Sequence, residues 1–327
     1  MTLTQLRYFA AIADAGLNIT LAAERLHATQ PGLSKQLKQL EDELGFLLFA
    51  RKGRSLDALT PAGAQVLAHA RRTLLEAANI RAYAANQRGD EQGQLVLATT
   101  HTQARFVLPP VIARIKQAYP QISVQLHPAA DNEVLALLAH GEADFALIST
   151  AGDTPAGGVA VPLFRWQRVV LVPKGHALAA ATTPTLAQLA QHPLISYESY
   201  IRPESSLRRA FADAGLSPQI AMTARDADLI KTYVRAGLGV GLLAEMAVNA
   251  VEDTDLHVLA APAVIPTCIT WAVLPRGGVL RDYAVALLHA LAPQIDRVEL
   301  RRVMAGNSEA DWPAPPDWVE LSQAITM

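Results

Sequence analysis

Four polar residues share one face of a predicted helix that begins near residue 30. Gln30, Ser34 and Lys38 follow one another at four-residue steps, and Lys35 lies beside them. Amide and hydroxyl groups can hydrogen-bond to the edges of bases, whereas lysines neutralise phosphates. Gln30, Ser34 and Lys35 are therefore candidates for contact with base edges, and Lys38 is a candidate for contact with a DNA phosphate.

The opposite face of the same segment is apolar and must pack inward. Its leucines recur at three- and four-residue steps at Leu33, Leu37, Leu40 and Leu44. Thr29 can cap this helix, and Pro31 fits its first turn, where a missing N–H removes no helical hydrogen bond. With a helical pattern over residues 18–26, this predicts a helix-turn-helix whose second helix enters the major groove. An ordinary helical hairpin with a solvated basic face fits the same segment.

A glycine-centred hairpin is predicted over residues 49–56 and carries Arg51, Lys52 and Arg54. Such a basic wing suits phosphates or a narrow minor groove, and we expect Arg51 or Arg54 to reach that groove. The candidate DNA-binding residues of this winged head, residues 1–60, are Thr29, Gln30, Pro31, Ser34, Lys35, Lys38, Arg51 and Arg54.

A long helix is predicted over residues 61–90, since Thr60 can cap it and Pro61 opens its first turn. Its small and apolar residues alternate three- and four-residue steps at Leu67, Ala70, Leu74 and Ala77. This pattern is typical of a short coiled-coil seam, which predicts self-association through the linker helix. Packing of the seam on its own chain is the alternative.

Strand and helix patterns alternate through residues 91–293 and predict α/β units with largely parallel sheets. The expected strands are 94–99, 121–127, 143–148, 167–173, 193–197, 219–224, 240–244 and 267–274. We expect two lobes with a ligand cleft between them. Lobe I takes about 94–162 and 267–292, and lobe II takes about 163–266. Residues 294–327 are expected to be an irregular tail whose tryptophans can dock on the body of the protein.

Two segments that follow predicted strands suit an anion. Residues 99–105 place threonines and Gln103 beside the free N–H groups of a helix start, whereas His101 is expected to be a structural histidine or one at the rim. After the strand at 193–197, Arg202 is either a bidentate clamp for a carboxylate or sulfonate, or an ordinary surface arginine. Neither a nucleophile–base set nor a metal-ligand cluster is recognisable in the sequence, so no catalytic residue, cofactor or metal is expected.

Composition sets further limits. The chain has 327 residues and a net charge of −2, with 11 basic and 8 acidic residues in its first 90. That mild asymmetry fits a DNA-binding head on an acidic sensor. The single Cys268 excludes a disulfide framework within the chain and suits a reducing compartment. With neither a signal segment nor a long apolar run, the chain is expected to be cytoplasmic and not to cross a membrane.

Several motifs of the head resemble the LysR-type transcriptional regulators. They are LRYF (6–9), AAERL (22–26), QPGLS (30–34), LEDELG (40–45), LFAR (48–51) and LTPAG (59–63). Three downstream segments resemble the subgroup of CysB, the activator of cysteine biosynthesis, and its relative Cbl. These are TTHTQAR (99–105), GEADFA (141–146) and DADLIKTYVR (226–235).

The resemblance implies a winged helix-turn-helix, a linker helix and a two-lobed α/β effector domain like that of periplasmic binding proteins. It implies a homodimer or homotetramer that binds a dyad-symmetric double-stranded DNA operator and changes the access of RNA polymerase. The effector would be sulfate, acetylserine or an organosulfur anion. Its implied contacts are Thr100, Thr102, Gln103 and Ser149, together with Arg202, which stands where the subgroup has threonine.

Alternative functions remain at this point. A LysR-type regulator of an unrelated pathway would respond to an organic carboxylate instead. A solute-binding protein shares the two-lobed architecture, but it would need an export signal and would leave residues 1–90 unexplained. An enzyme of similar fold would need the catalytic set that the sequence lacks.

Overall fold

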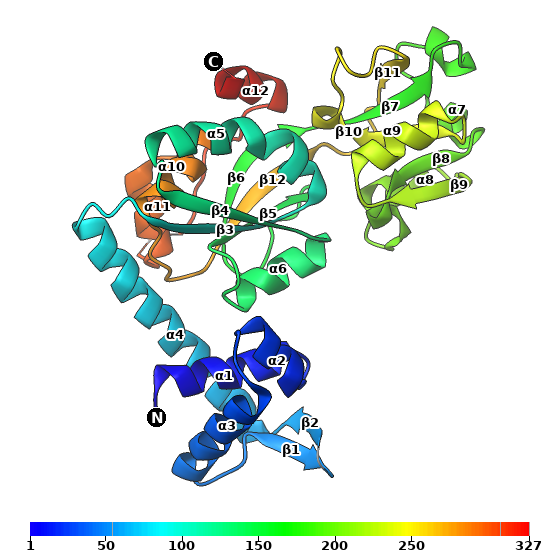
Figure 1. The fold of residues 1–327 in the computed structure, drawn as a ribbon. Helices are drawn as coiled ribbons and strands as arrows, with labels where there is room; N and C mark the ends of the chain where they lie inside the picture. The colour runs from blue at the N-terminus through cyan, green and yellow to red at the C-terminus, as the bar shows by residue number, and fades with distance from the viewer. Residues whose placement is uncertain (54, 308, 327) are drawn as a thin grey trace. The chain divides into compact units, whose positions relative to one another are not determined.

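The computed structural model describes residues 1–53, 55–307 and 309–326, and the chain divides into two compact units (Figure 1). One unit comprises Met1–Asp90 with Gly278–Arg281, and the other comprises Glu91–Gly277 with Asp282–Met327. Of the helices in the described residues, none has the length and apolar character needed to cross a membrane.

The first unit is a helical head with a two-stranded wing. Its elements are α1 (Leu3–Asp14), α2 (Ile19–Arg25), α3 (Gln30–Leu44), β1 (Phe49–Lys52), β2 (Ser55–Leu59) and α4 (Pro61–Gln87). Threonine or asparagine side chains cap all four helices by accepting a backbone N–H: Thr2, Asn18, Thr29 and Thr60. The leucine face of α3 packs into a core in which the Phe9 and Phe49 rings lie 5.3 Å apart. The predicted caps and the predicted inner face of α3 are therefore confirmed.

Helix α4 uses part of its apolar seam within the head. Leu67 and Ala70 are buried in the same core as α1, and Leu74 packs against that core. At these positions the seam therefore packs on its own chain, which was the alternative to self-association, because a buried side chain cannot also face a second chain. Farther along α4, the large apolar side chains that remain exposed are Ile80 and Tyr83, at 70% and 60% exposure.

The second unit contains two five-stranded sheets. The first sheet has the order β4-β3-β5-β12-β6. Its strands are β3 (Gly93–Thr99), β4 (Ile122–Pro128), β5 (Phe145–Thr150), β6 (Val159–Trp166) and β12 (Cys268–Leu274). The helices of this lobe are the π-helix η1 (Gln103–Val107), α5 (Leu108–Ala118), α6 (Asp131–Ala139) and α10 (Asp282–Leu291). Helix α6 covers one face of the sheet, and α5 and α10 cover the other (Figure 1).

The second sheet has the order β11-β7-β10-β8-β9. Its strands are β7 (Arg168–Pro173), β8 (Leu194–Tyr197), β9 (Ile220–Ala224), β10 (Val240–Ala244) and β11 (Leu256–Ala260). Helix α9 (Ala227–Arg235) packs on one face, and α7 (Leu186–Ala190) and α8 (Ser206–Asp213) pack on the other. The connections of this lobe include the 3-10 helices η2 (Ala177–Ala180), η3 (Glu198–Ile201) and η4 (Glu245–Ala247).

Both sheets are mixed rather than largely parallel, which corrects the prediction. Strand β12 runs antiparallel to β5 and β6, and β7 runs antiparallel to β10 and β11. Strands β6 and β11 are absent from the predicted set. Because β6 pairs with β12 up to Trp166, the chain leaves the first lobe at Gln167 rather than at residue 162.

The tail is also more ordered than its sequence predicts. It forms α11 (Arg297–Met304) and α12 (Trp318–Thr326), so the expectation of an irregular tail was wrong. Its tryptophans do dock on the body of the protein. Trp312 Nε1 donates to the Ala160 oxygen at 2.7 Å, and the Trp318 ring lies 5.1 Å from that of Phe164.

Candidate functional site

A cleft of about 380 Å³ opens where strands of both lobes end. Thr100 follows β3, Ser149 lies near the end of β5, and Arg202 follows η3 after β8. All five predicted effector residues line this cleft: Thr100, Thr102, Gln103, Ser149 and Arg202. The fold thus brings together side chains that are as much as a hundred residues apart along the chain.

The lobe I wall presents neutral polar groups at the start of η1. Gln103 is only 2% exposed, and its Nε2 donates to Ser149 Oγ at 2.9 Å. Its Oε1 is buried and has no hydrogen-bond partner among the described residues. A buried amide oxygen without a partner is costly and can be satisfied only by an N–H or O–H donor. An anion would instead accept the second Nε2 hydrogen of Gln103.

The Ser149 hydroxyl is fully occupied by protein groups. Ser149 Oγ lies 3.2 Å from Trp166 Nε1 and 2.9 Å from Thr270 Oγ1, in addition to Gln103. A hydroxyl has one proton to donate and two lone pairs to accept. Ser149 therefore holds Gln103 and Trp166 in place, with no hydrogen-bonding capacity left over for a ligand.

Tyr197 joins the two lobes inside the cleft. Its hydroxyl lies 3.5 Å from Thr102 Oγ1 and accepts the Ala244 N–H at 3.2 Å. Burial raises the pKa of the Tyr197 phenol, so this hydroxyl keeps its proton at neutral pH. Sequence reasoning missed Tyr197, which lies at the end of the strand predicted over residues 193–197.

Arg202 reaches from lobe II to helix α6 of lobe I. Its Nη2 donates to Asn132 Oδ1 at 3.1 Å, and its Nη1 lies 3.9 Å from Asp131 Oδ2. Burial within the cleft raises the pKa of the Asp131 carboxyl, and the Arg202 charge opposes that shift. The arginine is thus held across the cleft opening, and it is not an unattached surface side chain.

Arg168 is a further cation of the cleft that sequence reasoning missed. It follows Trp166 at the crossing between the lobes, and its guanidinium lies 5.7 Å above the Trp166 ring. No local pattern distinguishes this arginine from others in the sequence, because its position depends on the meeting of β6 and β7.

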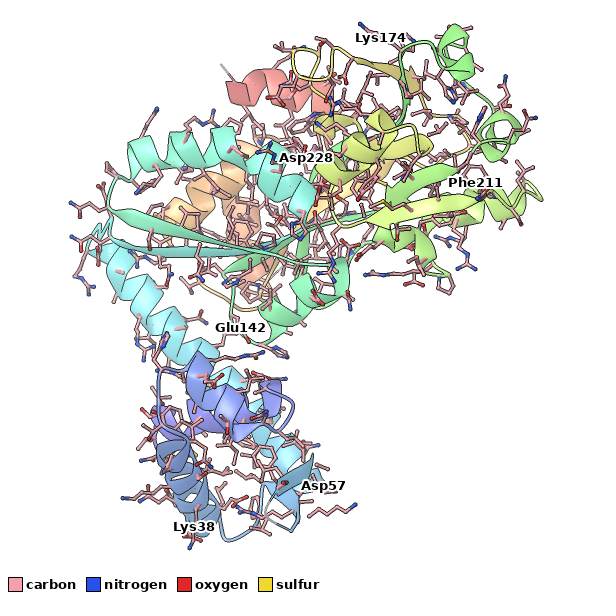
Figure 2. All side chains as sticks on the ribbon, turned by 45° about the vertical axis from the view of Figure 1, so that its right-hand side comes forward. Lys38, Asp57, Glu142, Lys174, Phe211 and Asp228 are labelled. Carbon is pink, nitrogen blue, oxygen red and sulfur yellow. The ribbon has the colours of Figure 1, made fainter. Side chains whose placement is uncertain are left out.

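A separate contact joins the lobes outside the cleft lining. Arg105 Nε lies 3.1 Å from Asp228 Oδ2, and Phe106 lies 5.4 Å from Lys231 Nζ. Asp228 belongs to the first turn of α9, and Figure 2 labels it there. Helix η1 therefore contacts the cleft through Gln103 and lobe II through Arg105 and Phe106.

The polar face of α3 is open to solvent. Lys35 and Lys38 are exposed, and Lys38 extends away from the helix (Figure 2). Gln30 Nε2 donates to Ser34 Oγ at 3.1 Å, which aligns these two side chains on one face. Thr29 caps the helix, and Pro31 occupies its first turn. The geometry suits a helix that reads a groove.

The wing is anchored by a buried carboxylate of α3. Glu41 is 4% exposed, accepts the Leu48 and Phe49 N–H groups, and pairs with Arg51 Nη2 at 3.1 Å. Arg51 thus has a structural partner in addition to any contact with DNA. Arg54 lies outside the described residues.

Comparison with known proteins places both units in one family. Residues 3–64 match the model "Bacterial regulatory helix-turn-helix protein, lysR family", and residues 88–296 match "LysR substrate binding domain". The regulator SsuR of Burkholderia cenocepacia is 37% identical over 300 residues, which are 92% of this chain and 97% of SsuR. CysB of Haemophilus influenzae is 39% identical over 297 residues, 91% of this chain and 92% of CysB.

A solved structure gives the same result for the second unit. The cofactor-binding domain of the Cbl transcriptional regulator superposes with a TM-score of 0.61 at 35% identity, covering 66% of this chain and 95% of that domain. The two-lobed α/β fold and the helix-turn-helix head are therefore both those of known regulators. The chain belongs to the LysR family of transcriptional regulators, and it is a DNA-binding regulator rather than an enzyme.

Proposed function

We propose that this protein controls genes of sulfur metabolism, for cysteine biosynthesis or the use of organosulfur compounds, in response to a small anion. The observation that carries the proposal is the cleft, which collects hydroxyl, amide and guanidinium donors from both lobes. Similarity to CysB, SsuR and Cbl over most of the chain supports it, as does the resemblance of residues 99–105 to the CysB and Cbl subgroup.

The anion is held by Thr100, Thr102 and Gln103 at the start of η1, opposite Arg202. Free N–H groups and the positive end of a helix stabilise negative charge there. Since these groups belong to different lobes, a bound anion favours the arrangement in which the lobes approach. The ligand shifts the population only by its difference in affinity for the two arrangements.

The head binds DNA and so converts effector binding into a change in transcription. Helix α3 enters the major groove with Gln30, Ser34 and Lys35 at base edges and Lys38 at a phosphate. Two heads in a homodimer recognise a dyad-symmetric operator, and two dimers bend the DNA between their sites. The exposed Ile80 and Tyr83 of α4 support self-association. The bend controls access of RNA polymerase in the cytoplasm.

A regulator of another pathway, which senses an organic carboxylate, is the second candidate. Arg202 is compatible with it, because a guanidinium pairs bidentately with a carboxylate as well as with a sulfonate. A thermal-shift screen over sulfate, thiosulfate, acetylated serines, sulfonates and aromatic carboxylates separates the two candidates. Stabilisation by the aromatic carboxylates alone would reject the sulfur proposal.

Substitution of Thr102 tests the anion site. Thr102→Val keeps the shape of the side chain and removes its hydroxyl, so we expect sulfate and acetylserine to bind about tenfold more weakly. Calorimetry on the full chain measures this, and operator binding by the unliganded variant should stay unchanged. Thr232→Val, which alters an exposed threonine of α9, is the control. Unaltered affinity in Thr102→Val would place the anion elsewhere.

Substitution of Lys38 tests the DNA-binding face. Lys38→Ala should weaken binding about equally on all sequences and reduce the slope of log K against log salt by roughly one unit, as expected for one phosphate contact. Lys174→Ala, which removes an exposed lysine of the effector domain, should leave the slope unchanged. A loss of affinity confined to one base position would contradict the phosphate role.

A further inference from the structure

The lobe II wall of the cleft holds two cations without counter-ions. Arg168 Nη2 donates to Ser206 Oγ at 3.0 Å and Nη1 donates to the Pro266 oxygen at 3.3 Å, so neutral groups fix the guanidinium. Arg209 lies one turn along α8 from Ser206 and is exposed. Among the described residues, neither arginine has a carboxylate within ion-pair distance.

The other charges of the cleft are paired or open to solvent. Arg202 faces Asp131, and Arg225 Nε lies 3.2 Å from Glu198 Oε2. The two remaining carboxylates of the lining, Asp153 and Glu204, are exposed. Water screens exposed charges strongly, so the main uncompensated positive charge of this wall is that of the partly buried Arg168, and the exposed Arg209 adds a weaker one.

Trp166 separates these cations from the neutral donors of lobe I. Its Nε1 donates to Ser149 Oγ, which also holds Gln103, while its ring lies under the Arg168 guanidinium at 5.7 Å. One indole therefore has an amide donor set at its edge and a guanidinium on its face. The cleft volume of about 380 Å³ leaves room for far more than a single tetrahedral oxyanion.

From this geometry we infer that the effector is a small molecule with two acidic groups joined by a short linker. Thr100, Thr102 and Gln103 hold one group, and Arg168 with Arg209 holds the other. The inference rests on the proposed anion site and names its ligand class. A guanidinium pairs bidentately with a carboxylate or sulfonate, and a ligand anchored at both ends draws the two lobes together more strongly than an anion with a single acidic group.

Calorimetry with the full chain tests this inference. The probes are 3-sulfopropanoate, which has two acidic groups, and methanesulfonate and propanoate, which have one each. Sulfate controls for charge, because it carries two negative charges on a single group. We expect 3-sulfopropanoate to bind about 10- to 100-fold more tightly than either one-ended anion. Arg168→Gln should remove that advantage and leave the affinity for methanesulfonate and sulfate unchanged.

Two further variants complete the design. Arg209→Gln changes an exposed side chain and should reduce the same advantage without affecting folding, whereas Arg276→Gln, outside the cleft, should have no effect. The inference is overturned if 3-sulfopropanoate binds no more tightly than the one-ended anions, or if Arg168→Gln weakens all anions equally. If no anion binds to the full chain at all, both the proposed anion site and the inference about its ligand class are rejected.

Discussion

Asp131 and Arg202 form an ion pair that contributes to the electrostatics of the cleft. With the carboxylate ionised, its charge offsets that of Arg202 and repels an incoming anion. Burial nevertheless raises the pKa of Asp131, so the protonated form is favoured over a wider pH range than for an exposed aspartate. Protonation releases Arg202 from its counter-ion and removes the repulsion.

We therefore predict that anion affinity rises as the pH is lowered. Above the raised pKa of Asp131 the carboxylate opposes binding, and below that pKa it is neutral, so the gain appears as the pH falls through it. Calorimetric titration with sulfate, which stays ionised throughout, measures the dependence. Asp131→Asn should bind more tightly at neutral pH and lose most of the dependence.

His101 also lines the cleft. His101→Gln is therefore the comparison variant for Asp131→Asn. A pH dependence that persists in Asp131→Asn and vanishes in His101→Gln would reject the role given to the aspartate.

At the scale of elements, the geometry of the DNA-binding surface depends on how α3 is joined to the wing. The Glu41 carboxylate is the connection, because it satisfies the N–H groups of Leu48 and Phe49 and one end of Arg51. The leucine periodicity predicted α3, and the glycine-centred run predicted the hairpin. Neither pattern indicates that a glutamate at the end of the helix holds the two together.

Glu41→Ala should destabilise the head and weaken operator binding although Glu41 is not on the polar face of α3. The substitution leaves buried N–H groups without partners, which costs about 1–3 kcal/mol for each. Urea unfolding and operator titration measure the two effects. Asp42→Ala, at the exposed neighbouring position, is the control, and an equal effect of both variants would argue against the anchoring role.

At the scale of the whole molecule, the C-terminal tail covers the exposed edge of the lobe I sheet. Helix α12 and the segment before it cover β6, an edge strand whose Arg165 N–H donates to the Pro316 oxygen at 2.8 Å. An uncovered edge strand offers unpaired backbone groups to other chains. The tail therefore completes the first lobe, and it lies outside the lining of the cleft.

Trp318→Ala should lower the free energy of unfolding by roughly 2–3 kcal/mol, because the half-buried ring and its contact with Phe164 are lost. Sulfate affinity should not change. Thermal and urea unfolding measure the first expectation, and calorimetry measures the second. Val319→Ala, with a side chain 55% exposed in the native helix, should be nearly neutral. Equal stability of the two variants would mean that the docked tail contributes little.

The sequence by itself determined those features that depend on neighbours along the chain. Caps, leucine spacing and the motifs of the head and of residues 99–105 indicate the family, and they predict α3, the wing and a polar helix start. Such patterns show which face of an element is buried, but not what covers it. For this reason the sequence did not show that Leu67 and Ala70 pack in the core of the head. It also did not show that the tail forms two helices.

Only the tertiary structure decided which distant side chains meet. Arg168 carries no local signal, and it becomes a cleft residue because β6 and β7 place it over Trp166 and beside Ser206. The ligand class follows from that meeting, since the charge of a site is the sum over all groups that the fold brings within screening distance. The polar helix start read from residues 99–105 forms only one of its walls.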